Sequence, residues 1–388
     1  MEVDRDLIDD AYIDYIKSQW RNNNSKDIVM GSRIRFYYFR IDYASGKQHY
    51  NGELFFKENK LGGMPVTIMN AYAKAGTRLS VEEIFRLNTK VPDKRILRPW
   101  MYTFCKAKSF GDACSVAEEN MAKGWWSLCY DKFDNTLNEW LVKLHKKEIS
   151  DHEKFNSIVK NDCLSDFWSC TIRELIEAIA HIHNCGLFHG SLSEYYNYVV
   201  VGDQVKLFNI GGCLKGLSVV DNQHSKKIQD FKDFRDFLKK LMPARSPKWN
   251  ERDSFLKCFD EKIDSYEKYV EKLKNHPFLL TPYKRVKYIT GIYYDDKFGV
   301  EDKLNRGSKF QKFRGWTRGR HKLKPFLRAV LESRNGKPYK DGPAELLRFL
   351  RNIYAHYRQY GDMEKIEEVD TIFRTLWVDF FDMIHVIT

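Results

Sequence analysis

The sequence lacks the cysteine pattern of a disulfide-stapled or metal-binding protein. Its 388 residues include eight cysteines, with no CxxC pair and no clustering with histidine. We therefore expect reduced, mostly buried thiols in an intracellular, reducing compartment, the cytoplasm, with the nucleus left open, and we expect no metal site. The cysteines are Cys105, Cys114, Cys129, Cys163, Cys170, Cys185, Cys213 and Cys258.

Long apolar runs are also missing. No stretch approaches the roughly eighteen apolar residues that a membrane-spanning helix needs. The first ten residues, MEVDRDLIDD, are acidic, whereas a signal peptide begins basic and continues apolar. The sequence predicts a soluble protein with no membrane partner in this chain.

Positive charge is concentrated in one segment. Residues 301–360 hold 16 Lys and Arg against 5 Asp and Glu, a balance of +11 out of +12 for the whole chain. Phe310, Phe313, Trp316 and Tyr339 are interleaved with these charges. A plain solubilising surface is the simpler explanation, but charge confined to one segment with aromatic residues between favours a polyanion such as RNA.

The segment 345–358, ELLRFLRNIYAHYR, predicts a helix with one buried stripe. Arg351, Asn352 and His356 fall off that stripe, and Asn352 and His356 are four residues apart on one face. A fixed cation, an amide and an imidazole on one rigid helix could grip and cleave a phosphodiester, although all three could equally be solvated surface. The expected stripe is Leu346, Leu347, Leu350, Ile353 and Tyr354.

Upstream, the pattern predicts an N-terminal helical extension followed by strands and helices in alternation. The extension covers residues 1–30, and the strands begin at Ile34. A helix with a capping box starts near Ser80, with Glu83 three residues on. The remaining expected elements are strands at 34–41, 53–56, 65–69, 100–104, 125–130, 198–201 and 205–208, and helices at 136–146, 165–183, 230–241, 282–294, 325–333, 344–357 and 367–384.

Several motifs in this order resemble those of protein kinases. His189-Gly-Ser-Leu192 resembles H-R-D-L, Asn209-Ile-Gly211 resembles D-F-G, and Val66-Thr-Ile-Met69 resembles V-A-I-K. Glu83 falls where the αC glutamate is expected. Asp230 and the helix after it resemble helix αF, and Asn275-His-Pro-Phe278 resembles the end of a kinase C-lobe. We expect His189 to brace the loop backbone, and His181 and His183 to be packing or hydrogen-bonding residues.

The charged groups of phosphoryl transfer are missing from these motifs. A kinase needs a lysine on the phosphates, an aspartate at the hydroxyl and an aspartate on Mg²⁺. Those positions hold Met69, Ser191 and Asn209, and the catalytic-loop asparagine is at best Asn197. The resemblance therefore implies a pseudokinase without kinase activity. Binding of ATP or ADP at the degenerate site near Met69, Glu83, Ser191, Asn197 and Asn209 stays open.

The chain continues for about 110 residues after Phe278, and this continuation resembles the kinase-extension nuclease family. The segment Tyr339-Lys-Asp-Gly-Pro-Ala-Glu-Leu-Leu-Arg-Phe-Leu-Arg-Asn-Ile-Tyr-Ala-His carries the likeness. The resemblance implies an α+β protein with a bilobal, degenerate protein-kinase-like domain at 31–280 and an all-α ribonuclease domain at 281–388. It places the catalytic roles on Tyr339, Arg351, Asn352 and His356.

That family cleaves RNA without a metal or other cofactor, by attack of the ribose 2′-OH on the adjacent phosphorus. The resemblance implies a 2′,3′-cyclic phosphate and a 5′-OH end, with RNA as substrate and a homodimer as the working form. His356 would protonate the leaving oxygen, and Arg351 would stabilise the phosphate. Asn352 would orient the phosphate or the histidine, and Tyr339 would accept the 2′-OH proton or position that hydroxyl. The alternative is a non-enzymatic scaffold that binds RNA or forms a heterodimer with a related kinase-nuclease.

Overall fold

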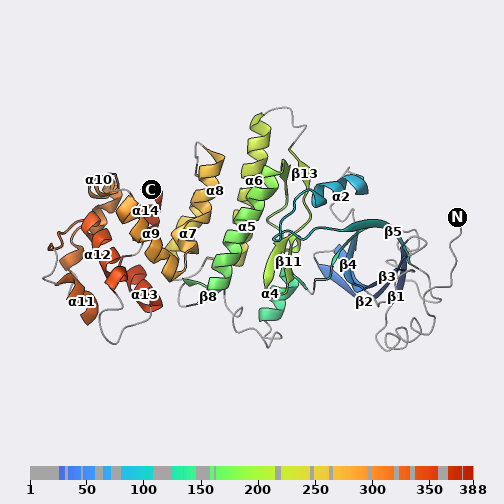
Figure 1. The fold of residues 1–388 in the computed structure, drawn as a ribbon, viewed down its shortest axis with the longest axis horizontal. Coiled ribbons are helices and arrows are strands. Elements are labelled where there is room, and N and C mark those ends of the chain that lie inside the picture. Colours follow the sequence, from blue (N-terminus) through green and yellow to red (C-terminus); the bar gives the residue numbers. More distant parts are fainter. Residues whose placement is uncertain are drawn as a thin grey trace. The chain divides into compact units, whose positions relative to one another are not determined.

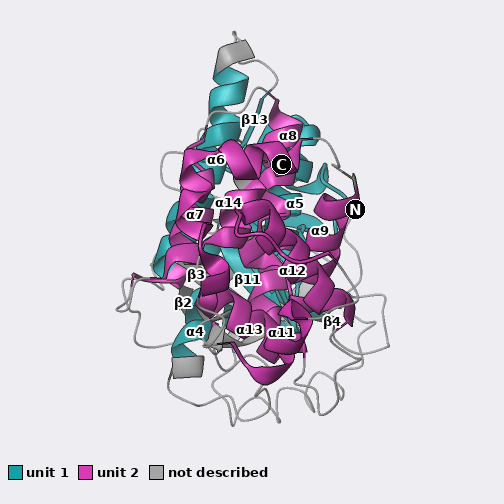
Figure 2. Cartoon of the chain, turned by 90° about the vertical axis from the view of Figure 1, so that its left-hand side faces the viewer, with its two compact units in different colours: residues 1–156, 174–240 teal, residues 157–173, 241–388 magenta. Residues whose placement is uncertain are grey.

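The computed structural model describes most of the chain and divides it into two compact units (Figures 1 and 2). Unit 1 comprises residues 1–156 and 174–240, and unit 2 comprises residues 157–173 and 241–388. The protein is a mixed α and β structure with small antiparallel sheets. The predicted domain boundaries after residues 30 and 280 stay predictions. The described residues are 26–30, 34–44, 47–56, 64–70, 80–107, 125–133, 135–145, 158–160, 163–214, 220–244, 249–261, 265–295, 299–318, 323–332, 337–356, 366–377 and 379–387.

Unit 1 contains six antiparallel strands that close into a barrel, in the order β1-β2-β3-β4-β6-β5. Pairing of β1 with β5, from Ile28 opposite Ala107, closes the barrel. The predicted strands are confirmed, while β1 occupies the end of the expected helical extension, and residues 1–25 of that extension lie outside the described residues. The strands are β1 (Lys26–Met30), β2 (Ile34–Ala44), β3 (Lys47–Phe56), β4 (Met64–Asn70), β5 (Met101–Ala107) and β6 (Trp125–Asp131).

The helix α2 (Val81–Thr89) begins with the predicted capping box. The Ser80 hydroxyl accepts from the Glu83 backbone N–H at 3.2 Å, and the Glu83 carboxylate accepts from the Ser80 N–H at 2.7 Å. Near the other end of α2, the buried Asn88 side chain donates to the Ile84 carbonyl at 2.8 Å and accepts from the Ile210 N–H at 2.8 Å. This amide therefore ties α2 to the segment that follows β12 (Gln204–Leu207).

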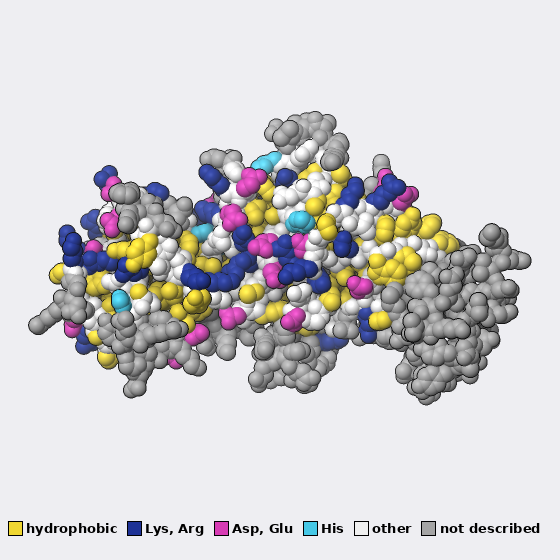
Figure 3. Space-filling view, viewed as in Figure 1, with side chains coloured by type: hydrophobic (Ala, Val, Ile, Leu, Met, Phe, Trp, Pro, Cys, Tyr) yellow, Lys and Arg dark blue, Asp and Glu magenta, His cyan; other side chains and the backbone are white. Residues whose placement is uncertain are grey.

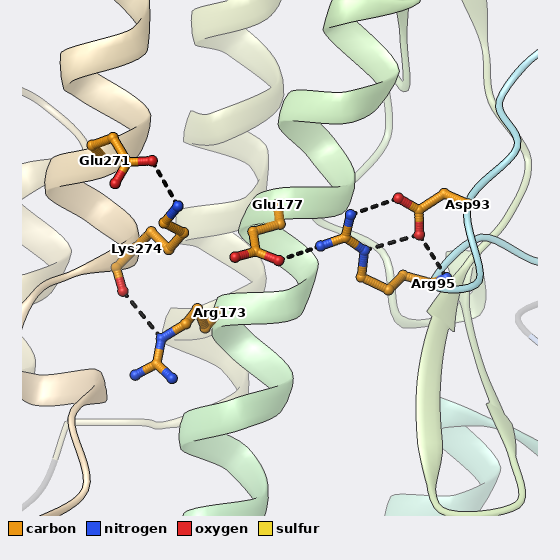
Figure 4. A network of polar contacts seen from close by, with 6 residues as sticks. All are labelled: Asp93, Arg95, Arg173, Glu177, Glu271 and Lys274. Carbon is orange, nitrogen blue, oxygen red and sulfur yellow. Dashed lines mark hydrogen bonds and ion pairs between the residues drawn. The ribbon is translucent and has the colours of Figure 1, made fainter. Parts of the chain in front are cut away.

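The remainder of unit 1 combines short sheets with helices. One sheet has the order β12-β11-β7, and β10 pairs with β13. On the loop before β5, the Arg95 guanidinium bonds to Asp93 at 2.6 Å and to Glu177 of α5 (Figure 4). The helix α6 begins ten residues earlier than predicted. The elements are β7 (Asn135–Thr136), α4 (Leu137–His145), β10 (Leu187–Phe188), the 3-10 helix η1 (Tyr195–Asn197), β11 (Tyr198–Val201), β12 (Gln204–Leu207), β13 (Gly212–Cys213) and α6 (Val220–Leu241). The helix α5 (Asp166–Asn184) belongs to unit 1 from residue 174 onward.

Unit 2 is mainly helical in its described part. A two-stranded ladder, β8 with β9, precedes the first residues of α5, whose Arg173 donates to the Lys274 carbonyl at 3.3 Å (Figure 4). No described helix of the chain is both long and apolar enough to cross a bilayer. The elements are β8 (Val159–Lys160), β9 (Cys163–Leu164), α7 (Asn250–Cys258), α8 (Tyr266–Lys274), η2 (Pro277–Leu279), α9 (Pro282–Asp295), α10 (Val300–Arg306), η3 (Ser308–Phe313), α11 (Pro325–Leu331), α12 (Pro343–His356), α13 (Ile366–Leu376) and α14 (Phe380–Ile387).

The predicted single helix over 367–384 is wrong, because the chain breaks between α13 and α14. Asp379 has a φ of 67°, in the left-handed region, and cannot continue a right-handed helix. Apolar residues continue on both sides of the break, since Phe373, Phe380 and Ile384 are all fully buried. The hydrophobic pattern therefore marked burial correctly but did not show the turn.

Candidate functional site

The helix α12 carries three of the candidate residues on the side that faces away from the core of unit 2. The predicted stripe is confirmed, and Leu346, Leu350 and Ile353 are fully buried in the core of unit 2. This burial fixes the rotation of the helix, so that Arg351 and Asn352 lie half-buried at its edge. Burial of each of these aliphatic side chains contributes on the order of 2 kcal/mol to folding.

Three of the four candidate residues form a continuous hydrogen-bonded chain. The Asn352 amide Nδ2 donates to the Tyr339 hydroxyl at 2.5 Å, and the Arg351 Nη1 donates to the Asn352 Oδ1 at 2.5 Å. The amide of Asn352 therefore uses both of its ends to join the phenol to the guanidinium. Residues 339 and 351, twelve apart in the sequence, become part of one polar cluster.

The guanidinium of Arg351 is also held from α9. Its Nη2 donates to the hydroxyl of Tyr294, and its centre lies 4.8 Å from the ring centroids of both Tyr293 and Tyr294. The Nε of Arg351 is buried without a hydrogen-bond partner among the described residues. Stacking and hydrogen bonding together fix a flat cation in one orientation.

The fourth candidate, His356, is the last residue of α12 and is half-buried. It lies one turn after Asn352 on the same side of the helix, because residues four apart share a face. The residues that follow it, 357–365, lie outside the described part of the chain. The helix thus brings an imidazole to the same side as the amide.

The ring of Tyr339 is supported by other aromatic and cationic groups. The guanidinium of Arg348 stacks over it at 4.4 Å, and the rings of Phe349 and Trp316 lie 5.3 Å and 6.1 Å away. Burial raises the pKa of the Tyr339 phenol, and the hydrogen bond from Asn352 and the charge of Arg348 offset only part of that rise. The phenol is therefore protonated at neutral pH.

The basic segment identified from the sequence contributes many exposed cations to unit 2. Lys and Arg side chains gather on the face drawn in Figure 3, over the helices of this unit. Some are paired with carboxylates, as Lys312 is with Asp379 at 3.1 Å. Among the described residues of the segment 301–360, the exposed cations are Lys303, Arg306, Lys309, Lys312, Arg314, Arg318, Lys324, Arg328, Lys337 and Lys340.

A second polar cluster lies in unit 1 around the carboxylate of Asp230. It accepts from the backbone N–H groups of His189 and Gly190 at 2.6 and 2.7 Å, and from the His183 ring at 2.9 Å. Burial alone would raise the pKa of Asp230, but the hydrogen bonds from the His183 ring and the His189 backbone hold it below its ordinary value. Burial lowers the pKa of His183, so a neutral ring meets an ionised carboxylate.

The same cluster confirms the expectations for two of the histidines. The His189 ring bonds to the Phe208 carbonyl at 2.8 Å and is fully buried, so it braces the loop backbone as expected. His183 is a buried hydrogen-bonding residue, whereas His181 is half-buried and has the Cys185 sulfur 3.9 Å from its ring nitrogen. Within the described part of the chain, neither His181 nor His183 belongs to a group of side chains that could hold a metal ion.

The residues predicted for a degenerate nucleotide site are brought together only in part. The Asn197 side chain donates to the Ser191 carbonyl at 2.6 Å, and the Asn209 amide donates to the Asn197 Oδ1 at 3.2 Å. Asn209 has a φ of 65°, a left-handed conformation that asparagine tolerates better than most residues. Met69 is buried in the apolar core of unit 1, and the carboxylate of Glu83 caps its own helix.

Among the described residues, no group of three or more His, Cys, Asp and Glu side chains could hold a metal ion. Comparison of the chain with protein-family profiles and with curated proteins finds no match. The assignment of function therefore depends on the side chains themselves.

Sequence reasoning missed Tyr294 and Arg348, which complete the α12 cluster. Arg348 bonds to the Lys337 carbonyl at 2.8 Å and to Glu345 at 2.9 Å, and so fixes the segment that carries Tyr339. The spacing of Glu345 and Arg348, three residues apart on a helix, was a usable signal. Nothing in the sequence pairs Tyr294 with Arg351, because 57 residues separate them.

Proposed function

We propose that this chain is a metal-independent endoribonuclease whose active site lies on α12. The observation that carries the proposal is the hydrogen-bonded chain from Tyr339 through Asn352 to Arg351, with His356 one turn further on. The resemblance of this segment to the kinase-extension nucleases supports the same four residues. The concentration of exposed cations in unit 2 supports a polyanionic substrate.

The proposed reaction is transesterification within the RNA strand. The ribose 2′-oxygen bonds to the adjacent phosphorus and its proton passes to solvent water, while the bond from phosphorus to the 5′-oxygen breaks and that oxygen leaves with a proton from His356. The products are a 2′,3′-cyclic phosphate and a 5′-OH end. Arg351 pairs with the non-bridging oxygens as negative charge builds on them. Asn352 holds the Arg351 guanidinium and the Tyr339 phenol in fixed positions relative to each other through its two hydrogen bonds.

The surroundings of Tyr339 favour one of its two candidate roles. A phenol whose pKa is raised by burial is a poor acceptor of the 2′-OH proton at neutral pH. Its hydroxyl oxygen accepts from Asn352, which leaves its own O–H to donate. We therefore assign Tyr339 to positioning the ribose hydroxyl rather than to removing its proton.

We further propose that residues 31–280 form a degenerate protein-kinase-like domain without phosphotransfer activity, followed by an all-α ribonuclease domain at 281–388. The anchoring of the His189–Gly190 backbone by Asp230 supports the likeness to a catalytic loop. Neutral or apolar side chains at Met69, Ser191 and Asn209 supply none of the charge that phosphoryl transfer needs. Its expected role is to control pairing with a second copy, with ATP or ADP as a candidate ligand.

The decisive experiment is RNA cleavage in the presence of EDTA. Wild-type protein should cut single-stranded RNA and leave a 2′,3′-cyclic phosphate, and His356→Ala should reduce the rate by about 10²- to 10⁴-fold. The matched control is His224→Ala, which removes an exposed histidine of α6 in unit 1. Loss of wild-type cleavage on adding EDTA would refute the mechanism.

One observation favours the alternative of a non-enzymatic scaffold. Both terminal nitrogens of Arg351 and the oxygen of Tyr339 already have hydrogen-bond partners within the protein, as side chains with a structural role would. A scaffold of this kind would bind RNA, or pair with a related kinase-nuclease, without cutting. Salt-dependent RNA binding with no cleavage, unchanged by His356→Ala, would establish it.

A further inference from the structure

The helix α9 has a buried side and an exposed side. Ile289 is fully buried, and the buried Arg285 pairs with Asp370 of α13 at 2.9 Å. Tyr283 and Tyr294 are instead 58% and 50% exposed, values unusual for large aromatic side chains. Packing of the helix thus leaves two tyrosines in solvent.

Three exposed residues of α9, Tyr283, Lys287 and Tyr294, lie in one row along the helix, while the exposed Lys284 lies off that row. Lys287 is four residues after Tyr283. Tyr294 is eleven residues after Tyr283, which is about three full helical turns. The Lys287 ammonium lies 5.1 Å from the Tyr283 ring centroid. The row therefore alternates aromatic ring, cation and aromatic ring over about 16 Å, at 1.5 Å per residue.

This row leads directly into the α12 cluster. Tyr294 accepts a hydrogen bond from Arg351 Nη2 and stacks on the same guanidinium at 4.8 Å. A ring in that position serves two purposes, because its hydroxyl orients the cation while its exposed part remains open to a flat ligand. A scaffold built only for packing would have no need of an exposed tyrosine there.

We propose that the row Tyr283–Lys287–Tyr294 holds single-stranded RNA, with bases stacked on the two tyrosines and a backbone phosphate on Lys287. Exposed aromatic rings alternating with cations suit unpaired nucleotides, whose bases can stack, and not a duplex, whose bases are already stacked. The net positive charge of unit 2 favours the same ligand. This surface deepens the proposed function and rests on it for the class of substrate.

The test is equilibrium binding of a short fluorescein-labelled single-stranded RNA, measured by anisotropy in the His356→Ala background. Tyr294→Ala and Tyr283→Ala should each weaken binding by about 5- to 100-fold, from the stacking free energy of one base. Tyr283→Phe keeps the ring and should bind within about twofold of the parent. Trp126→Ala, at an exposed aromatic residue of unit 1, is the matched control and should bind like the parent.

Lys287 is tested by the salt dependence of the same binding. Lys287→Ala should reduce the slope of log Kd against log salt by about 0.7, the value for one phosphate contact on a single strand. Lys90→Ala, at an exposed lysine of unit 1, should leave the slope unchanged. Circular dichroism of each variant checks that the fold is retained.

Three results would overturn the inference: no binding by the parent, parental affinity in both alanine variants, or equal losses with the same RNA as a duplex. The proposed nuclease is tested separately by cleavage with wild-type His356. Binding that depends on the tyrosines without any cleavage would refute the nuclease and retain the surface. Cleavage that persists unchanged in Tyr283→Ala and Tyr294→Ala would retain the nuclease and refute the RNA-binding surface.

Discussion

The carboxylate of Asp230 in unit 1 and the guanidinium of Arg351 in unit 2 are each held by several partners, but in different surroundings. Asp230 is 1% exposed and all of its contacts fix the backbone and a neutral histidine. Arg351 is half-buried, and its partners are side chains on the surface of a helix pair. A buried charge surrounded by donors stabilises a loop, whereas a charge fixed at an edge remains able to meet a ligand.

The largest effect should come from removing the buried charge. Asp230→Ala leaves two backbone N–H groups and the His183 ring without their acceptor, at a cost of about 3–5 kcal/mol in the free energy of unfolding. Urea denaturation followed by circular dichroism measures this loss. The control is Asp203→Ala, because Asp203 is exposed, whereas Asp233 is half-buried. A loss below about 1 kcal/mol would show that Asp230 is not the anchor of its loop.

The complementary change in unit 2 should affect catalysis and not stability. Arg351→Lys retains the charge but loses the planar fork that meets Asn352 and Tyr294, and we expect RNA cleavage to fall by about 10²- to 10³-fold. The midpoint of thermal unfolding, measured in parallel, should move little because Arg351 is half-buried at the edge of the core of unit 2. The same substitution at Arg328, an exposed residue of α11, should leave cleavage unchanged. A large loss of stability in Arg351→Lys would make the residue structural instead.

Asp382 of α14 provides a buried charge that, unlike Asp230, is poorly compensated. Burial and the nearby Asp379 raise its pKa to about 7, so the folded state binds a proton that the unfolded state releases above its ordinary pKa near 4. Stability due to this group is therefore present at low pH and declines as pH rises from about 4 to 7. Asp382→Asn should become progressively more stable than wild type over that range, by about 1.4 kcal/mol per pH unit.

A nearby histidine hides this effect in the wild-type protein. Burial lowers the pKa of His385 to about 4, so the unfolded state binds the extra proton and stability rises with pH between about 4 and 6.5. The two trends oppose each other between about pH 4 and 6.5. Only the difference in stability between wild type and Asp382→Asn therefore shows the pH dependence that Asp382 contributes. Urea midpoints at a series of pH values measure it, with the exposed Glu368→Gln as control. A difference independent of pH would contradict the assignment.

The smallest effect concerns the backbone of the degenerate nucleotide site. Asn209 adopts a left-handed conformation, so Asn209→Ala should destabilise the protein by about 1–2 kcal/mol, whereas Asn209→Gly should be close to neutral. Thermal unfolding of the two variants gives the comparison. Equal stabilities would mean that the conformation of residue 209 carries no strain, and that the amide itself, through Asn197, is what matters.

The secondary structure was largely predictable because local patterns generate it. The capping box at Ser80 and Glu83 and the apolar stripe of α12 depend on residues within one or two turns of each other. The break at Asp379 was not predictable, because the apolar pattern is unchanged across it and aspartate only tolerates the left-handed conformation. The pairing of His183 with Asp230 spans 47 residues and equally escapes local reasoning.

By itself, the sequence determined which residues of α12 face the core, because the helical period decides on which side of the helix each residue lies. The same period placed Arg351, Asn352 and His356 outside the apolar stripe. The sequence also concentrated the positive charge near them. Only the tertiary structure decided that Tyr339 would meet Asn352 and that Tyr294 would meet Arg351, because those contacts depend on how helices pack. The raised pKa of Tyr339 likewise follows from burial, which is a property of the folded chain.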